Sequence, residues 1–171
     1  MRKILTTVST KWIYLILFFF PHWLLAQSAM INIESRNTTS LNGEWKVILD
    51  PTGVGDWRQV WLEKKPLKKT DFFEYSFEDG PTLDVPGDFN SQLPELTYLE
   101  GVVWYKKEFN QSIEPGKRIF VHFGAVNYLS NVYLNGQLIG SHEGGFTPFQ
   151  FEITDRIQNG KNTLVVNPNY A

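Results

Sequence analysis

The chain has 171 residues, of which 20% are charged and none is cysteine, and its formal net charge at pH 7 is −2. This length suffices for one ordinary domain. Without cysteine, neither disulfides nor thiolate metal ligands can hold the fold together. A mildly acidic chain has no electrostatic reason to bind nucleic acid, so no nucleic-acid partner is expected. With only three histidines besides, we expect no metal and no cofactor.

The first 26 residues have the order of a secretory signal peptide. Arg2, Lys3 and Lys11 form a basic start, residues 12–20 are an unbroken apolar run, and residues 24–26 read LLA. The apolar run is shorter than the about 20 residues that a membrane span requires. We therefore expect cleavage, export to the periplasm or the extracellular space, and no membrane contact afterwards. An uncleaved N-terminal anchor is the alternative.

The remaining chain is predicted to be all-β. Residues 27–39 are polar and form a leader strand or an N-terminal arm, and one domain follows over residues 40–171. Within it, apolar or alternating runs recur roughly every 8–12 residues with turn signals between them, which is typical of a sandwich or barrel. Asn135-Gly136 between two apolar runs predicts a tight hairpin with a type I′ turn. Strands are predicted at 44–49, 72–77, 82–85, 102–109, 118–123, 131–140 (the hairpin), 149–153 and 163–166, with a turn at 155–161.

The aromatic residues are expected to fill the core between two sheets, because their rings bury large apolar areas. Trp45, Trp104 and Tyr105 suggest a flat platform for carbohydrate, but at strand spacing such residues usually lie in the core. Only residues 57–65 favour a helix, since Trp57 and Trp61 are four residues apart and would share one helical face.

Six segments share a pattern of glycine, aromatic and turn residues. Taken in their order along the chain, these segments resemble the N-terminal domain of family 2 glycoside hydrolases, the β-galactosidase/β-glucuronidase type. The resemblance covers residues 40–166 and implies a jelly-roll, galactose-binding-like antiparallel β-sandwich, usually called the sugar-binding domain. The segments are 41–45 (LNGEW), 85–89 (VPGDF), 101–109 (GVVWYKKEF), 123–136 (FGAVNY to VYLNG), 140–151 (GSHEGGFTPFQF) and 159–166 (NGKNTLVV).

In that family an immunoglobulin-like sandwich and a (β/α)₈ barrel follow, and the barrel carries the two glutamates of a retaining mechanism. The sequence stops at Ala171, so the resemblance implies a non-catalytic domain of an exported β-glycosidase and no catalytic residue is assigned. The carbohydrate partner is a β-glycoside, bound through the missing catalytic domain. Pro168 departs from the family's continuous last strand. Because proline cannot donate to a ladder, that strand should end early or lie at an edge.

The loop at residues 89–101 is the candidate sugar-binding segment, because it is long and polar. The resemblance implies that the loop before the 102–109 strand reaches toward the active-site mouth of the barrel. Tyr98 would then stack on a sugar ring, and Glu100 would accept hydrogen bonds from hydroxyls. Asp88 and Asn90 are further candidate contacts. The alternative is a solvated loop that packs on the missing barrel.

Three alternatives concern function more broadly. Glu143 beside His142 offers a general acid next to an imidazole, although a polar loop whose glycines meet backbone needs is the expected role. The domain could also be a stand-alone carbohydrate-binding module, or a decayed product that does not fold stably. The sequence ends two or three residues after a disrupted last strand, which favours a piece of a larger enzyme over a finished module and also favours the decayed product.

Overall fold

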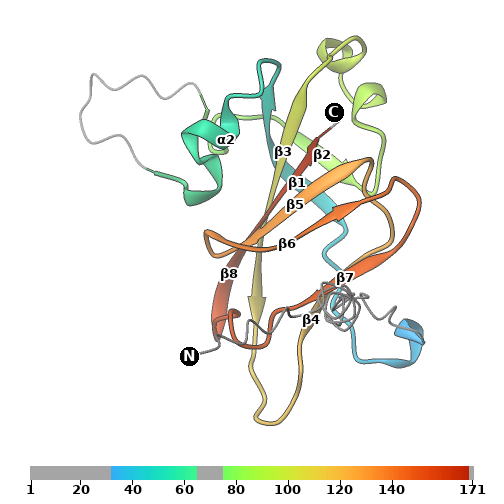
Figure 1. Ribbon diagram of the computed structural model, residues 1–171, viewed down its shortest axis with the longest axis vertical. Coiled ribbons are helices and arrows are strands. Elements are labelled where there is room, and N and C mark those ends of the chain that lie inside the picture. Colours follow the sequence, from blue (N-terminus) through green and yellow to red (C-terminus); the bar gives the residue numbers. More distant parts are fainter. Residues whose placement is uncertain (1–31, 65–74, 170–171) are drawn as a thin grey trace, which may run out of the picture.

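The computed structural model describes residues 32–64 and 75–169, and within these ranges the chain is all-β (Figure 1). Its strands form two antiparallel sheets, one in the order β2-β1-β3-β8-β5-β6 and one of β4 and β7. The helical elements are α2 (Gly55–Arg58) and 3₁₀ turns at Ile33–Ser35, Val60–Leu62, Phe89–Ser91 and Pro94–Leu96. The strands are β1 (Gly43–Asp50), β2 (Thr82–Val85), β3 (Val102–Gln111), β4 (Phe120–Phe123), β5 (Leu129–Leu134), β6 (Gln137–Glu143), β7 (Phe149–Glu152) and β8 (Gly160–Asn169).

These strands confirm the all-β prediction and the predicted hairpin. Strand β5 ends at Leu134 and β6 begins at Gln137, so Asn135 and Gly136 make the connection. Their φ angles are 50° and 79°, the positive values that a type I′ turn requires at both central residues.

Three predictions need comment. The predicted signal peptide lies outside the described residues, and so do residues 72–74 of the strand predicted at 72–77; residues 75–77 are not in a strand. In the predicted arm, the described part holds the 3₁₀ turn Ile33–Ser35 instead of a strand.

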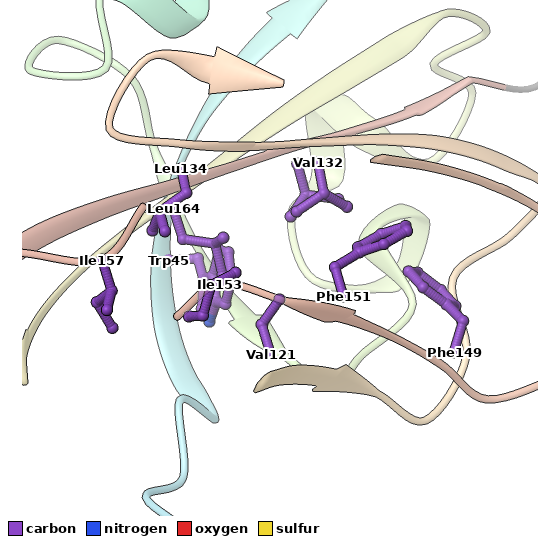
Figure 2. Close-up of a cluster of buried hydrophobic side chains, with 10 residues drawn as sticks. Trp45, Val121, Val132, Leu134, Phe149, Phe151, Ile153, Ile157 and Leu164 are labelled. Carbon is purple, nitrogen blue, oxygen red and sulfur yellow. The ribbon is translucent and has the colours of Figure 1, made fainter. Parts of the chain in front are cut away.

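The two sheets pack face to face around a hydrophobic core (Figure 2). Alternation along each strand produces this core, since every second side chain points to the same face. Trp45 lies in it and donates its indole N–H to the Leu41 carbonyl at 2.9 Å, which links two residues of the LNGEW segment. The buried members are Trp45, Val121, Val132, Leu134, Phe149, Phe151, Ile153, Ile157, Leu164 and Val166.

The opposite face of the large sheet is covered by the segment that contains α2. Trp61 stacks there on Tyr133, with ring centroids 4.4 Å apart, and on Trp104 at 5.8 Å. The helix predicted at 57–65 is present only in part, because Gln59 adopts a left-handed conformation with φ 55° that ends α2 at Arg58, and a 3₁₀ turn at Val60–Leu62 follows. Trp57 and Trp61 consequently do not share a face, and Trp57 is 84% exposed.

The prediction that Pro168 ends β8 early is wrong, and the predicted edge position holds only for the last residues of the strand, where β8 no longer pairs with β3. Strand β8 continues to Asn169 and lies between β3 and β5. Its pairing with β3 stops at Val166, whereas Pro168 still pairs with Ser130 of β5. Proline is tolerated because β8 has a neighbour on one side only at this point, so the missing N–H interrupts no second ladder.

At one end of the small sheet, an exposed ion pair joins the residues before β4 to the end of β7. This ion pair predicts an unusually acidic carboxyl group. Arg118 donates from Nε and Nη2 to the two carboxylate oxygens of Glu152, at 2.9 and 2.6 Å. The Arg118 hydrogen bond, followed by one from Thr154, lowers the pKa of Glu152 to about 2. A depressed pKa means that this contact stabilises the fold above the ordinary pKa of a glutamate and is lost as the pH falls toward 2.

A carbon-13 NMR titration of the Glu152 carboxyl tests this prediction. In Arg118→Gln the pKa of Glu152 should return toward its ordinary value, because the bidentate donor is gone. Lys117→Gln is the matched control, since Lys117 pairs with Glu114 instead, and it should leave Glu152 unchanged. A Glu152 that titrates near 4.5 in the unaltered chain would contradict the prediction.

Candidate sugar-binding site

The loop between β2 and β3, predicted to contact sugar, is fixed to the sheet by apolar side chains. Its two 3₁₀ turns, Phe89–Ser91 and Pro94–Leu96, bury Phe89 and Leu96. These side chains pack against Val47, Leu83 and Val103 of the large sheet. The loop therefore holds a defined shape, with Asp88, Ser91 and Glu95 exposed on its outer side.

Two amide side chains complete the loop. Asn90 donates from Nδ2 to the Leu96 carbonyl at 2.7 Å and so joins the two 3₁₀ turns. Gln92 accepts from the Asp84 N–H at 2.7 Å and donates to the Asp84 carbonyl at 3.0 Å. Strand β2 is the outermost strand of its sheet, so the Gln92 amide replaces the missing neighbouring strand.

The outer surface of the loop forms an open depression of about 670 Å³, lined by Asp88, residues 90–94 and Thr97. Carboxylate, amide and hydroxyl groups of Asp88, Asn90, Ser91, Gln92 and Thr97 contribute to this lining beside a larger apolar part, and such groups hydrogen-bond well to sugar hydroxyls. Chemically, the depression can bind a polar ligand by hydrogen bonds, but it does not enclose one as a catalytic pocket does.

The structure brings together two of the four predicted contact residues. Asp88 and Asn90 line the depression, whereas Tyr98 and Glu100 do not. Tyr98 is 92% exposed, and Glu100 is also exposed. The ring of Tyr98 is thus available for stacking, but the geometry does not join it to Asp88 and Asn90 in one pocket.

Gln92 is the residue of this loop that the sequence analysis missed. Its distance of eight residues from Asp84 matches no capping or hairpin pattern. A long amide side chain near a predicted edge strand was the only available signal, and that signal is weak because glutamine is common on surfaces.

The other aromatic and acidic candidates lie in the core or in a surface connection, and none of them lines the depression. Trp45 is buried between the sheets with Tyr105 half-buried against the same cluster, whereas Trp104 is buried in the cluster on the outer face of the large sheet, so both tryptophans are core residues but only Trp45 lies between the sheets. His142 forms a hydrogen bond with Thr147 at 3.1 Å, and Glu143 is an exposed acceptor at the end of β6. The pair therefore lies at the surface, in agreement with the polar connection that was expected.

The described residues contain neither a helix that could span a membrane nor a cluster of metal ligands. Among residues 32–64 and 75–169, no helix has the length and apolar character to cross a bilayer. The same residues contain no group of three or more histidines and acidic side chains placed to hold a metal ion.

Comparison with known proteins identifies the family. Residues 38–168 match the family model described as glycosyl hydrolases family 2, sugar binding domain. The chain belongs to this family. The six segments that resemble a family 2 sugar-binding domain all lie between residues 41 and 166, within the matched range.

Its relatives are much longer than the chain. It is 33% identical over 138 residues to the β-glucuronidase of Canis lupus familiaris, covering 74% of the chain and 19% of that protein. It is 34% identical over 110 residues to the β-galactosidase of Thermoanaerobacter pseudethanolicus, covering 61% of the chain and 14% of that protein. The solved β-glucuronidase of Ruminococcus gnavus is 30% identical with a TM-score of 0.63, covering 77% of the chain and 20% of that structure. This family 2 domain thus spans about a fifth or less of the proteins that it matches.

Proposed function

We propose that the chain is the non-catalytic N-terminal domain of an exported family 2 glycoside hydrolase that acts on a β-glycoside. The observation that carries the proposal is the match over residues 38–168 to a sugar-binding domain, combined with relatives of which the chain spans about a fifth. In this proposal the sandwich is of the jelly-roll type, and the signal peptide at residues 1–26 directs export.

The acidic residues of the sandwich support a non-catalytic role. A retaining glycosidase needs two carboxyl groups about 5–5.5 Å apart on either side of the scissile bond. Glu63, Glu78 and Glu108 gather in the structure, but all three form ion pairs with the ammonium of Lys106, whose side chain is 3% exposed. The ammonium occupies the space between these carboxylates that a sugar would need.

The domain would contribute to catalysis by supporting the barrel and by shaping one wall of the substrate pocket. The β2–β3 loop suits this role because its apolar residues fix it to the sheet, while Asp88, Tyr98 and Glu100 are exposed on it and Asn90 is partly exposed. No nucleic-acid partner is proposed.

A stand-alone carbohydrate-binding module is the second candidate. The exposed ring of Tyr98 favours it, because exposed aromatic faces on a rigid scaffold are suited to stacking on sugar rings. The two functions share sugar recognition and differ in whether the bound sugar belongs to a substrate.

A turnover assay of the full chain tests the non-catalytic role. The purified chain should release no 4-nitrophenol from 4-nitrophenyl β-D-glucuronide or 4-nitrophenyl β-D-galactoside above the rate in buffer. The assignment would be overturned by turnover that a single substitution such as Glu143→Gln abolishes. Glu114→Gln is the matched control, since Glu114 lies in an exposed pair with Lys117.

A further inference from the structure

The loop between β6 and β7, on the outside of the sandwich in Figure 1, is held in a fixed shape. The Gly144 N–H donates to the Tyr128 carbonyl at 2.8 Å. His142 Nε2 and Thr147 Oγ1 are hydrogen-bonded at 3.1 Å, and the His142 ring stacks on buried Phe149 with centroids 4.1 Å apart. Contacts at both ends of the loop thus fix it before any ligand arrives.

Glycine at position 145 tightens the same loop. A Cβ at Gly145 would lie 2.5 Å from Asn127 Oδ1, so any larger residue there would require the Asn127 side chain to move. The loop therefore packs directly on the residue before Tyr128. Because the loop is already ordered, a ligand would not have to meet the entropic cost of ordering it.

This rigid loop presents the ring of Phe146 to solvent, beside the ring of Tyr128 from the β4–β5 connection and the carboxylate of Glu143 at the end of β6. Phe146 is 94% exposed and Tyr128 is 46% exposed. The Tyr128 hydroxyl donates to Glu143 Oε1 at 2.9 Å, and this hydrogen bond raises the pKa of Tyr128 above its ordinary value. Phe146 follows Gly144, whose N–H is bonded to the Tyr128 carbonyl, by two residues, which reach at most about 7 Å along the chain, so the backbone of Phe146 lies on the same part of the surface as Tyr128.

The chemistry of this surface fits a sugar better than a protein. Protein interfaces bury about 800 Å² per partner around a largely apolar centre. Here the exposed rings are bordered by the exposed polar side chains of Glu143, Thr147 and Asn127. An aromatic face can pack on the C–H face of one pyranose, while a carboxylate accepts hydrogen bonds from its hydroxyls.

We propose that Tyr128, Glu143 and Phe146 form a saccharide-binding surface that is separate from the β2–β3 loop and selects a neutral pyranoside. The inference rests on the proposed sugar-binding function and adds the site and the charge class of the sugar. Glu143 determines that class, because its negative charge repels the carboxylate of a uronic acid. This surface would thus prefer a different sugar from the glucuronide that the names of several relatives indicate.

The test is an NMR titration of the full chain with two probes that differ only at C6, methyl β-D-glucopyranoside and methyl β-D-glucopyranosiduronate. The neutral glycoside should shift the amide signals of residues 143–147 with a dissociation constant in the millimolar range. Phe146→Ala should weaken this binding roughly tenfold, whereas Phe146→Tyr, which keeps the ring, should retain it. Glu143→Gln should narrow the difference between the two probes.

Trp57→Ala is the matched control, because it removes an equally exposed ring on a different segment and should leave the binding unchanged. Absence of binding, or binding that survives Phe146→Ala, overturns the inference. Shifts confined to the depression at residues 88–97 also overturn it, yet they leave the proposed function intact. Failure of the proposed function is a separate result, namely turnover of an aryl glycoside by the chain alone.

Discussion

Replacing Trp104 by alanine is expected to lower the free energy of unfolding by about 3–5 kcal/mol. Trp104 is fully buried, at 0% exposure, in the cluster on the outer face of the large sheet. Its indole N–H donates to Asp50 Oδ2 at 3.2 Å, and the same carboxylate accepts from the N–H groups of Val54 and Gly55. The substitution would leave a large cavity and would weaken the carboxylate site that anchors the start of α2.

Equilibrium unfolding in urea measures this effect. A domain has a free energy of unfolding of about 5–15 kcal/mol, so a loss of this size could leave Trp104→Ala unfolded. Trp104→Phe is therefore the second, milder variant. It keeps an aromatic ring but removes the N–H donor, and a loss of about 1–3 kcal/mol is expected. Trp57→Ala, at an exposed position, should change the stability by no more than about 0.5 kcal/mol. Equal losses for Trp104→Ala and Trp57→Ala would contradict the predicted core.

Replacing Lys106 by methionine should lower the free energy of unfolding by about 2–3 kcal/mol at neutral pH. This is less than the loss expected when a fully buried ion pair is broken, because the carboxylate partners of Lys106 are partly exposed. Lys106 forms an ion pair with Glu63 and lies 3.2 Å from Glu108 and 3.7 Å from Glu78. Methionine fills a similar volume, so the loss reports the charge and not a cavity. The three carboxylates would be left facing one another without their shared cation.

The pH dependence of this loss has a defined sign. Burial would lower the pKa of Lys106, but the hydrogen bonds and charges of Glu63 and Glu108 outweigh it and leave the pKa above its ordinary value. The hydrogen bond from Lys161, opposed by burial and helped by Lys106, lowers the pKa of Glu108. The stabilisation is therefore lost as the pH rises through the pKa of Lys106, and lost again as it falls through that of Glu108.

Urea unfolding of Lys106→Met and the unaltered chain, repeated across the pH range, checks this prediction. The difference between the two should be largest near neutral pH and should shrink in acid and in strong alkali. Lys117→Met is the matched control, because it breaks only the exposed pair with Glu114 and should cost less than about 0.5 kcal/mol. A difference for Lys106→Met that does not vary with pH would show that the ion pairs contribute nothing.

Much of the sandwich could be predicted because local signals and the tertiary structure agree. The turn at Asn135-Gly136 needs positive φ at both residues, and this pair of residue types supplies it. Trp45 and Trp104 occur at strand spacing and are buried, as large rings in strands usually are.

The failures have physical causes that are not local. The spacing of four between Trp57 and Trp61 suggested a longer helix. Gln59 breaks that helix by adopting a left-handed conformation, which is uncommon for a non-glycine residue and could not be expected from the sequence. Pro168 was expected at an edge, but it sits in a central strand at the point where β3 no longer pairs. Whether Pro168 is tolerated there depends on where β3 stops pairing with β8, and local sequence patterns do not predict that position.

The candidate site was harder to predict than the fold. The loop was found because it is long and polar, and Asp88 and Asn90 do line its depression. The direction in which Tyr98 and Glu100 point depends on how the turns at Phe89–Ser91 and Pro94–Leu96 pack on the sheet. The backbone contacts of Gln92 depend on the same packing, which no pattern of residues along the chain expresses.

The most direct test of the central claim is to read the gene beyond the codon for Ala171. We predict that the reading frame, or a neighbouring frame, continues into a second sandwich and a (β/α)₈ barrel with a pair of catalytic glutamates. A stop codon followed by unrelated sequence would contradict the assignment to a larger glycosidase and would favour a stand-alone module.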